Sequence, residues 1–299
     1  MFKKLGITFA IILLLSGGSL KAQVITGIDD SPKKPAPSGE RSILGVKLRP
    51  EVAAMVAGIE KKCGRELYAE FAGQEDFMLA QSFVDENRLP VVLVDPRFAR
   101  QKEKLEAIII HELLHLALRV NNYPVFIFSP AVKTGRGPAI DTEQGNINDL
   151  KNLIEHRIFK ADMERYGVDK LLDLSGDTAR IARQNKGREG NNTDIINYTR
   201  AVLEYLDPKD VAEVTRVYSE NGWTRDLKAG REIADIIAAS NIETPAEYEA
   251  VFLRCLQKLY PLPAGYAFKL TLDPKNRIFR QMIVGAGPAA GGKRAVRRN

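Results

Sequence analysis

The chain has 299 residues, enough for one large domain or two smaller ones, and its composition of 44% hydrophobic and 27% charged residues is that of a soluble globular protein. Its net charge of +6 comes from the two ends, because three lysines lie within residues 1–22 and four basic residues lie within residues 285–299. The remainder is close to neutral, which argues against a nucleic-acid-binding surface on the fold.

Residues 1–22 have the pattern of a secretory signal peptide. A short basic start precedes an apolar core at residues 6–15, and small residues lead to a cleavage position after Ala22. The apolar core is too short to span a bilayer comfortably, so an uncleaved membrane anchor is the weaker alternative. No cysteine follows it, which excludes a lipoprotein anchor. We expect an exported protein, periplasmic or secreted, with no stable membrane span after signal removal.

The expected fold class is α+β and predominantly helical, with a small sheet beside a central helix. Residues 23–45, rich in proline and lysine, predict a flexible linker. Residues 46–168 form the expected core, and residues 169–284 a mostly helical region. Residues 285–299 predict a disordered basic tail.

The first half of the core predicts a helix, two strands and a second helix. Apolar spacing predicts the first helix from Pro50 to about Phe71. Short strands follow at residues 77–83 and 89–94. The second strand, with Val91 to Val94, is expected to be an edge strand that can bind a peptide by strand addition. The next helix is expected to start near residues 99–102 and to end at residue 119 or 120.

The rest of the chain predicts mostly helices. Residues 125–132 are apolar and fit a strand or a loop, and residues 133–148 predict a long irregular loop. A helix over residues 150–166 ends at Gly167. The remaining expected elements are helices at 169–174, 197–206, 208–219, 225–239 and 245–260, and a hairpin of strands 266–272 and 278–284.

A His-Glu-x-x-His motif at residues 111–115 lies inside the apolar run of the second expected helix. Residues four apart lie one turn apart on the same helix face, so His111 and His115 can direct their imidazoles at one point. Two such histidines are what a zinc ion needs as its first ligands. Glu112 points to a neighbouring part of the surface, where it can reach a zinc-bound water.

A third ligand must come from another segment, and Glu155 is the favoured candidate. It lies among apolar residues of the helix expected over 150–166, where an unpaired carboxylate would be costly to bury. His156 is the rival ligand; it points about 100° away, so both cannot easily bind the same ion. Asp162, two turns along from Glu155, is the expected hydrogen-bond acceptor for a ligating histidine.

These residues predict a zinc-dependent hydrolase. Zinc lowers the pKa of its bound water, and Glu112 accepts the proton as general base. A donor for the developing oxyanion is also needed, and His156 and Tyr166 are the main candidates beside Tyr123 and Arg157. The sequence does not choose among them.

The motif with its flanking sheet and the helix carrying Glu155 resembles the zincin metallopeptidases over residues 67–167. A glutamate as third ligand is similar to the gluzincin branch, whereas residues 116–119 lack the glycine and third histidine of the metzincins. The resemblance implies a zinc ion and a peptide or protein substrate. The alternatives are a non-catalytic zincin-fold protein that binds a peptide or envelope partner, and a chance match of the motif on a buried helix. The oligomeric state is open.

Cys63 and Cys255 both lie in helical patterns among apolar residues. An oxidising compartment would permit a disulfide between them, and two buried free thiols are the alternative.

Overall fold

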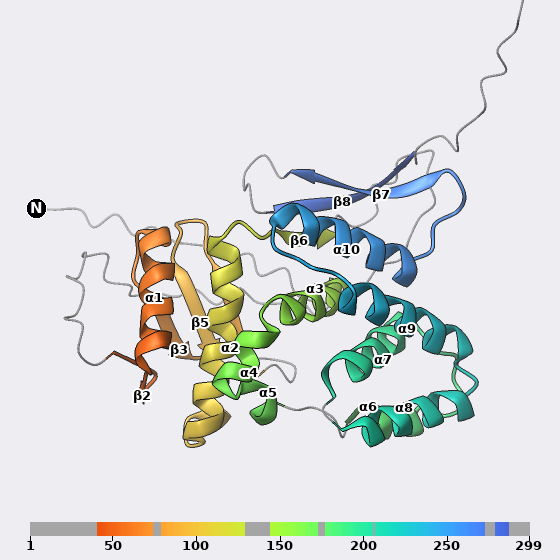
Figure 1. Ribbon diagram of the computed structural model, residues 1–299, viewed down its shortest axis with the longest axis horizontal. Coiled ribbons are helices and arrows are strands. Elements are labelled where there is room, and N and C mark those ends of the chain that lie inside the picture. Colours follow the sequence, from red (N-terminus) through yellow and green to blue (C-terminus); the bar gives the residue numbers. More distant parts are fainter. Residues whose placement is uncertain are drawn as a thin grey trace, which may run out of the picture.

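The computed structural model describes residues 41–73, 79–128, 144–172, 177–205, 207–272 and 279–286. It is a mixed α+β protein with small sheets and a majority of helix, which confirms the expected class at that level. The expected signal peptide, most of the expected linker and residues 287–299 of the expected tail lie outside the described residues. Figure 1 shows α1 and α2 with one small sheet on one side, and helices α6 to α9 on the other.

The first helix is shorter than its apolar spacing predicts. After a small hairpin of β1 (Ser42–Ile43) and β2 (Val46–Lys47), α1 (Pro50–Cys63) begins with proline in its first turn. Gly64 ends it in the left-handed conformation, with φ of 73°. The segment that was expected to complete the helix is instead strand β3 (Tyr68–Phe71).

The first sheet has three strands in the order β3-β5-β4, in which β5 (Pro90–Val94) is central. It pairs in parallel with β3 and antiparallel with β4 (Ala80–Val84). The prediction that Val91 to Val94 form an edge strand is therefore wrong. The near-continuous β-branched run fits a central strand, buried on both faces. Strand β4 is the edge that packs beside α2.

Helix α2 (Lys102–Val120) carries the motif and confirms the expected helix. It follows a short 3₁₀ helix, η1 (Pro96–Phe98), and is apolar on most of its circumference. A helix of that kind is stable when other elements cover it on several sides. Here α1, α5 and strands β4 and β5 pack against it.

The segment expected as one helix over residues 150–166 consists of two helices. Helix α3 (Gln144–Ile158) begins earlier than expected, after strand β6 (Val125–Phe128). Phe159, with φ of −105° and ψ of 22°, separates it from α4 (Lys160–Tyr166). Residues 129–143, most of the expected irregular loop, lie outside the described residues. Gly167 ends α4 in the left-handed conformation, as its type predicts.

The second half of the chain is mostly helical, as expected, but its helix bounds differ from the prediction. Helix α6, for example, has no counterpart among the expected elements. Strands β7 and β8 form the expected antiparallel hairpin, and β6 adds in parallel to give a sheet of order β6-β8-β7. The elements are α5 (Val168–Leu171), α6 (Asp177–Gln184), α7 (Asn192–Glu204), α8 (Pro208–Glu220), α9 (Thr224–Ala238), α10 (Pro245–Leu259), β7 (Tyr266–Leu272) and β8 (Phe279–Ala286).

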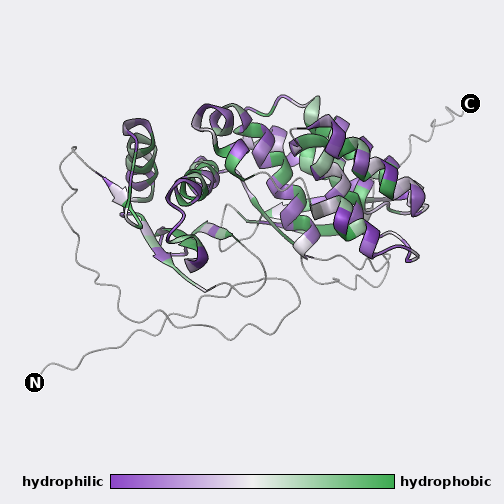
Figure 2. Cartoon of the chain, turned by 90° about the horizontal axis from the view of Figure 1, so that it is seen from below, coloured by the Kyte–Doolittle hydropathy of each residue, from purple (hydrophilic) through white to green (hydrophobic). Residues whose placement is uncertain are grey.

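The main hydrophobic core joins both halves of the chain. It extends from Ile43 to Met282 and includes side chains of α1, α2, α3, α7, α9 and α10. A smaller core, around Tyr218 and Trp223, lies among α6, α7 and α8. Figure 2 shows the corresponding pattern, in which many helices carry hydrophobic residues on one side and hydrophilic residues on the other.

Both cysteines are buried free thiols, so no disulfide joins Cys63 to Cys255. Burial raises the pKa of Cys255 to about 12, which keeps this thiol protonated. None of the helices in the described ranges is long and apolar enough to cross a membrane.

Candidate metal centre

Three histidines from two helices lie together beside the sheet. His111 and His115 come from α2, and His156 comes from α3. One ring nitrogen of each lies within 4.8 Å of the corresponding nitrogens of the other two. The Nε2 atoms of His111 and His115 are 3.1 Å apart. Tetrahedral zinc ligands at the usual bond length lie about 3.4 Å apart, so this pair already has the spacing of two ligands of one ion.

His115 is oriented by a buried carboxylate. Its Nδ1 donates to Oε2 of Glu155 at 2.6 Å, since an ionised carboxylate can only accept. The other oxygen of Glu155 accepts hydrogen bonds from Arg119 and, at 2.6 Å, from the hydroxyl of Tyr248 on α10. Glu155 is fully buried, and this set of donors satisfies both of its oxygens. The proton on Nδ1 leaves the lone pair of His115 on Nε2, which faces His111.

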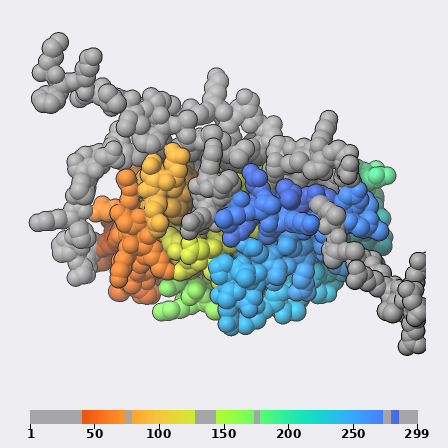
Figure 3. Space-filling view, turned by 90° about the horizontal axis from the view of Figure 1, so that it is seen from above, coloured from red at the N-terminus to blue at the C-terminus, as the bar shows by residue number. Residues whose placement is uncertain are grey.

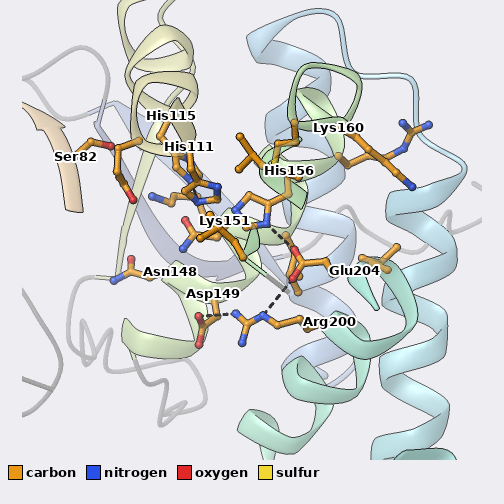
Figure 4. Close-up of a pocket in the computed structure, with 18 of the residues that line it drawn as sticks. Ser82, His111, His115, Asn148, Asp149, Lys151, His156, Lys160, Arg200 and Glu204 are labelled. Carbon is orange, nitrogen blue, oxygen red and sulfur yellow. Dashed lines mark hydrogen bonds and ion pairs between the residues drawn. The ribbon is translucent and has the colours of Figure 1, made fainter. Parts of the chain in front are cut away.

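A carboxylate from the second half of the chain orients His156, as Glu155 orients His115. Its Nδ1 donates to Oε1 of Glu204, at the end of α7, at 2.5 Å. Glu204 also pairs with Arg200, which in turn binds Asp149 on α3, so the chain of contacts returns to the helix that carries His156. Figure 4 draws this chain as dashed lines. Nε2 of His156 is buried and has no hydrogen-bond partner among the described residues.

The structure thus groups His156, rather than Glu155, with the two motif histidines. Glu155 was the favoured third ligand, but both of its oxygens are engaged, one of them with the far nitrogen of His115. It makes the hydrogen bond that was expected from Asp162. The helix break at Phe159 places Asp162 on α4, and the described residues show no contact between Asp162 and the histidines.

Tyr166, an expected oxyanion donor, does not line the cleft beside the histidines. It stacks under the guanidinium of Arg49, 5.3 Å from the ring centre. His156, the other expected donor, lies within the histidine group itself.

Glu112 lies next to the histidines, 8% exposed, and hydrogen-bonds to Ser82 on β4. Burial raises the pKa of Glu112 to about 7, while Ser82 and the charge of Lys151 counteract part of that rise. A carboxyl group with a pKa near neutrality can both accept and return a proton at physiological pH.

His111 and His115 are suited to bind a cation rather than to carry charge themselves. Burial lowers the pKa of His115 to about 4, against the opposing effect of Glu155. Burial, followed by the neighbouring His115 and His156, also lowers the pKa of His111. Neutral imidazoles with fixed tautomers are the usual nitrogen ligands of zinc. The unpartnered Nε2 of His156 fits that use, because a bound metal would satisfy it.

The three histidines and Glu112 line a cleft of about 1100 Å³. Strand β4 forms one wall, and residues of α3, α4 and α7 form the other. The cleft therefore lies between the first sheet and the helices of the second half. Figure 3 shows these two parts side by side, with a strip of yellow surface between the orange and the blue.

The sequence did not reveal the residues that orient the histidines. Glu204 and Tyr248 lie 48 and 93 residues away from their partners, beyond the reach of spacing arguments. One signal was present: Arg119 stands one turn after His115, within the apolar run of the motif helix. A buried arginine requires a carboxylate partner, and Glu155 was the buried carboxylate available.

Comparison of the chain with protein-family models, with curated proteins and with solved structures gives no match. The function is therefore argued from the geometry of the metal centre and its cleft.

Proposed function

We propose that the protein is an exported zinc-dependent hydrolase, most simply a peptidase with a zincin-like core. The observation that carries the proposal is the group of three imidazoles, one buried and two half-buried, beside Glu112, which adjoins His111 on the same helix. Three protein ligands are what a catalytic zinc site uses, since the fourth position is needed for water.

His111, His115 and His156 are the proposed ligands, and Glu155 and Glu204 hold the second ring nitrogens of two of them. Nitrogen-only ligand sets favour zinc over magnesium or calcium, which prefer oxygen. The proposed ligand set differs from the gluzincin pattern. Glu155 accepts a hydrogen bond from the ligand His115 and is not itself a proposed ligand.

A bound zinc ion would supply a Lewis acid and lower the pKa of a coordinated water. Glu112 would accept the proton of the attacking water and pass it to the leaving amine. Its hydrogen bond to Ser82 holds the carboxylate in place, and its raised pKa suits both transfers. The buried position of Glu112 strengthens its electrostatic interaction with the reacting groups.

Strand β4 is the proposed binding edge for an extended peptide. Within the described residues its only strand neighbour is β5, and residues 79–84 line the cleft beside the histidines. An added peptide strand would bond to the outward backbone groups of β4 and pass close to Glu112.

The test combines zinc analysis with cleavage of a mixed peptide library by wild type and Glu112→Gln. We expect about one zinc per chain in both proteins, and loss of cleavage by at least about 100-fold in the variant. Zinc in both proteins with identical behaviour towards the library would contradict the hydrolase and favour a binding protein. Absence of zinc from both would contradict the metal centre itself.

A further inference from the structure

Lys151 differs from every other cationic side chain described along the cleft, because it has no hydrogen bond or ion pair among the described residues. The other four cations that line the cleft all have partners. They are Arg119 with Glu155, Arg157 with the carbonyl of Ala238, Lys160 with Glu164, and Arg200 with Asp149.

The carboxylates near Lys151 are already engaged. Glu112 bonds to Ser82, Asp149 pairs with Arg200, and both oxygens of Glu155 are taken. Lys151 is half-buried in the wall of the cleft, so its ammonium group loses part of its hydration without gaining a partner, which is costly. Burial accordingly lowers the pKa of Lys151. The cleft is the remaining direction from which a partner can reach it.

Lys151 also lies close to the reacting groups. It stands one helical turn before Glu155 on α3, and it lines the same cleft as Glu112 and the three histidines. Figure 4 shows it beside His111 and His115, on the side of Asn148 and Asp149. A group bound to Lys151 would therefore lie in the same cleft as the bond presented to the metal centre.

The charge of the loaded site favours an anion. Three neutral imidazoles leave a bound dication with both of its charges, whereas a glutamate ligand would cancel one. Lys151, Arg119 and Arg200 add three more positive charges. The carboxylates of Glu112, Glu155, Asp149 and Glu204 oppose them, so a net positive charge of one remains when the dication is bound. The loaded cleft is thus positive near Lys151, and a negatively charged substrate group would be attracted there.

We propose that the Lys151 ammonium binds a substrate carboxylate that lies next to the bond to be hydrolysed. This inference rests on the proposed function, since it assigns a substrate class to the same cleft. The carboxylate can be the free C-terminal group of a peptide or an acidic side chain beside the scissile bond. Both offer the same acceptor to an ammonium group.

The experiment measures binding without turnover, by calorimetry on zinc-loaded Glu112→Gln. The probes are N-acetyl-tetra-alanine with a free carboxylate, the same peptide as its amide, and that amide with one internal alanine replaced by glutamate. We expect the acid, the glutamate peptide or both to bind about tenfold more tightly than the neutral amide. Tighter binding of the acid identifies a C-terminal carboxylate as the bound group, and tighter binding of the glutamate peptide identifies an acidic side chain.

The same titrations are repeated on zinc-loaded Glu112→Gln that also carries Lys151→Met, Lys151→Arg or Lys160→Met. Lys151→Met should abolish the preference for the anionic probe, and Lys151→Arg should retain part of it. Lys160→Met should leave the preference intact, because Lys160 lines the same cleft but already pairs with Glu164. Equal binding of all probes, binding of none, or a preference that survives Lys151→Met would overturn the proposal.

Failure of this inference is distinguishable from failure of the proposed function. Library cleavage by wild type without any preference for anionic probes would leave the hydrolase standing and remove the carboxylate site. A Lys151-dependent preference in a zinc-loaded protein that cleaves nothing would leave the carboxylate site standing and remove the hydrolase.

Discussion

Glu204, the last residue of α7, accepts a hydrogen bond from Nδ1 of His156 on α3. This contact connects the helical second half of the chain to the histidine group. The second half therefore helps to build the site, although its sequence contains no residue that would be assigned to metal binding by motif.

Replacement of Glu204 by alanine should weaken zinc binding by about 10- to 100-fold, because His156 loses the acceptor that orients its ring. Glu204→Gln retains an acceptor and should recover part of the affinity. Competition with a chelator of known affinity measures the effect. Glu213→Ala, which removes the surface ion pairs of Glu213 with Arg216 on α8 and Arg183 on α6, is the matched control. Equal zinc affinity of Glu204→Ala and wild type would show that the contact is not needed.

His156→Ala should lower the affinity for zinc, whereas Glu155→Gln should lower the stability of the metal-free protein. His156→Ala should lower zinc affinity by more than about 100-fold, beyond the effect of an outer-shell change, and leave the metal-free fold intact. Glu155→Gln should destabilise the metal-free protein by about 3 kcal/mol, because Arg119 keeps its charge in a buried place without a carboxylate.

Zinc content and urea unfolding of chelator-treated protein separate these two effects. If Glu155→Gln lost its zinc while the metal-free protein unfolded like wild type, Glu155 would have to be regarded as a ligand again.

Asp226 should make stability depend on pH. It is 2% exposed, and burial, followed by the charge of Asp194, raises its pKa from 3.8 to about 6. A raised pKa means that the folded state binds the proton more tightly, so this contribution to stability is present below about pH 4 and is lost as the pH rises through 6.

Asp226→Asn should therefore be more stable than wild type by up to about 3 kcal/mol at pH 7.5, with the difference shrinking towards pH 4.5. Urea unfolding at a series of pH values measures it. Asp235→Asn, at an exposed position on the same helix, should show no comparable trend. A difference that is constant with pH would argue against a buried titrating carboxyl.

Two glycines in helix interiors should respond oppositely to alanine. A Cβ on Gly230 of α9 would lie 2.9 Å from the carbonyl oxygen of Ile195 and 2.9 Å from the ring of Tyr198, so α7 and α9 would be forced apart. We expect a loss of about 1–3 kcal/mol.

A Cβ on Gly58 of α1 meets nothing within 4 Å. Gly58→Ala should stabilise the protein by about 0.5–1 kcal/mol, since alanine favours the helix. Thermal unfolding of both variants checks the pair, and a gain at position 230 would contradict the close packing.

The motif helix was predictable because its information is local. The spacing of His111 and His115 and the surrounding apolar run both lie within α2, and the structure confirms its bounds. The extent of α1 was less predictable, because Leu67 and Phe71 continue the apolar spacing of the helix although Gly64 ends it. There the pairing of β3 with β5, which requires residues 23 positions away, outweighs the local pattern.

The third histidine shows a different limit. The helical period places Glu155 and His156 about 100° apart but does not say which of them faces α2. That choice depends on the rotation of α3 about its axis, which is set by contacts with Arg119, Tyr248 and Glu204. Two of those three residues lie in the half of the chain for which the sequence suggested no role.

The dependence of the histidines on distant acceptors has a consequence for the order in which the protein matures. A growing or truncated chain that ends before Glu204 would contain all three histidines but lack the hydrogen-bond acceptor of His156. A chain that ends before Tyr248 would lack one of the donors to Glu155, the carboxylate that orients His115. In the proposed zinc protein, high-affinity metal uptake would therefore wait until the whole fold has assembled. With the proposed export, an unfolded chain would cross the membrane without its metal and acquire it at its destination.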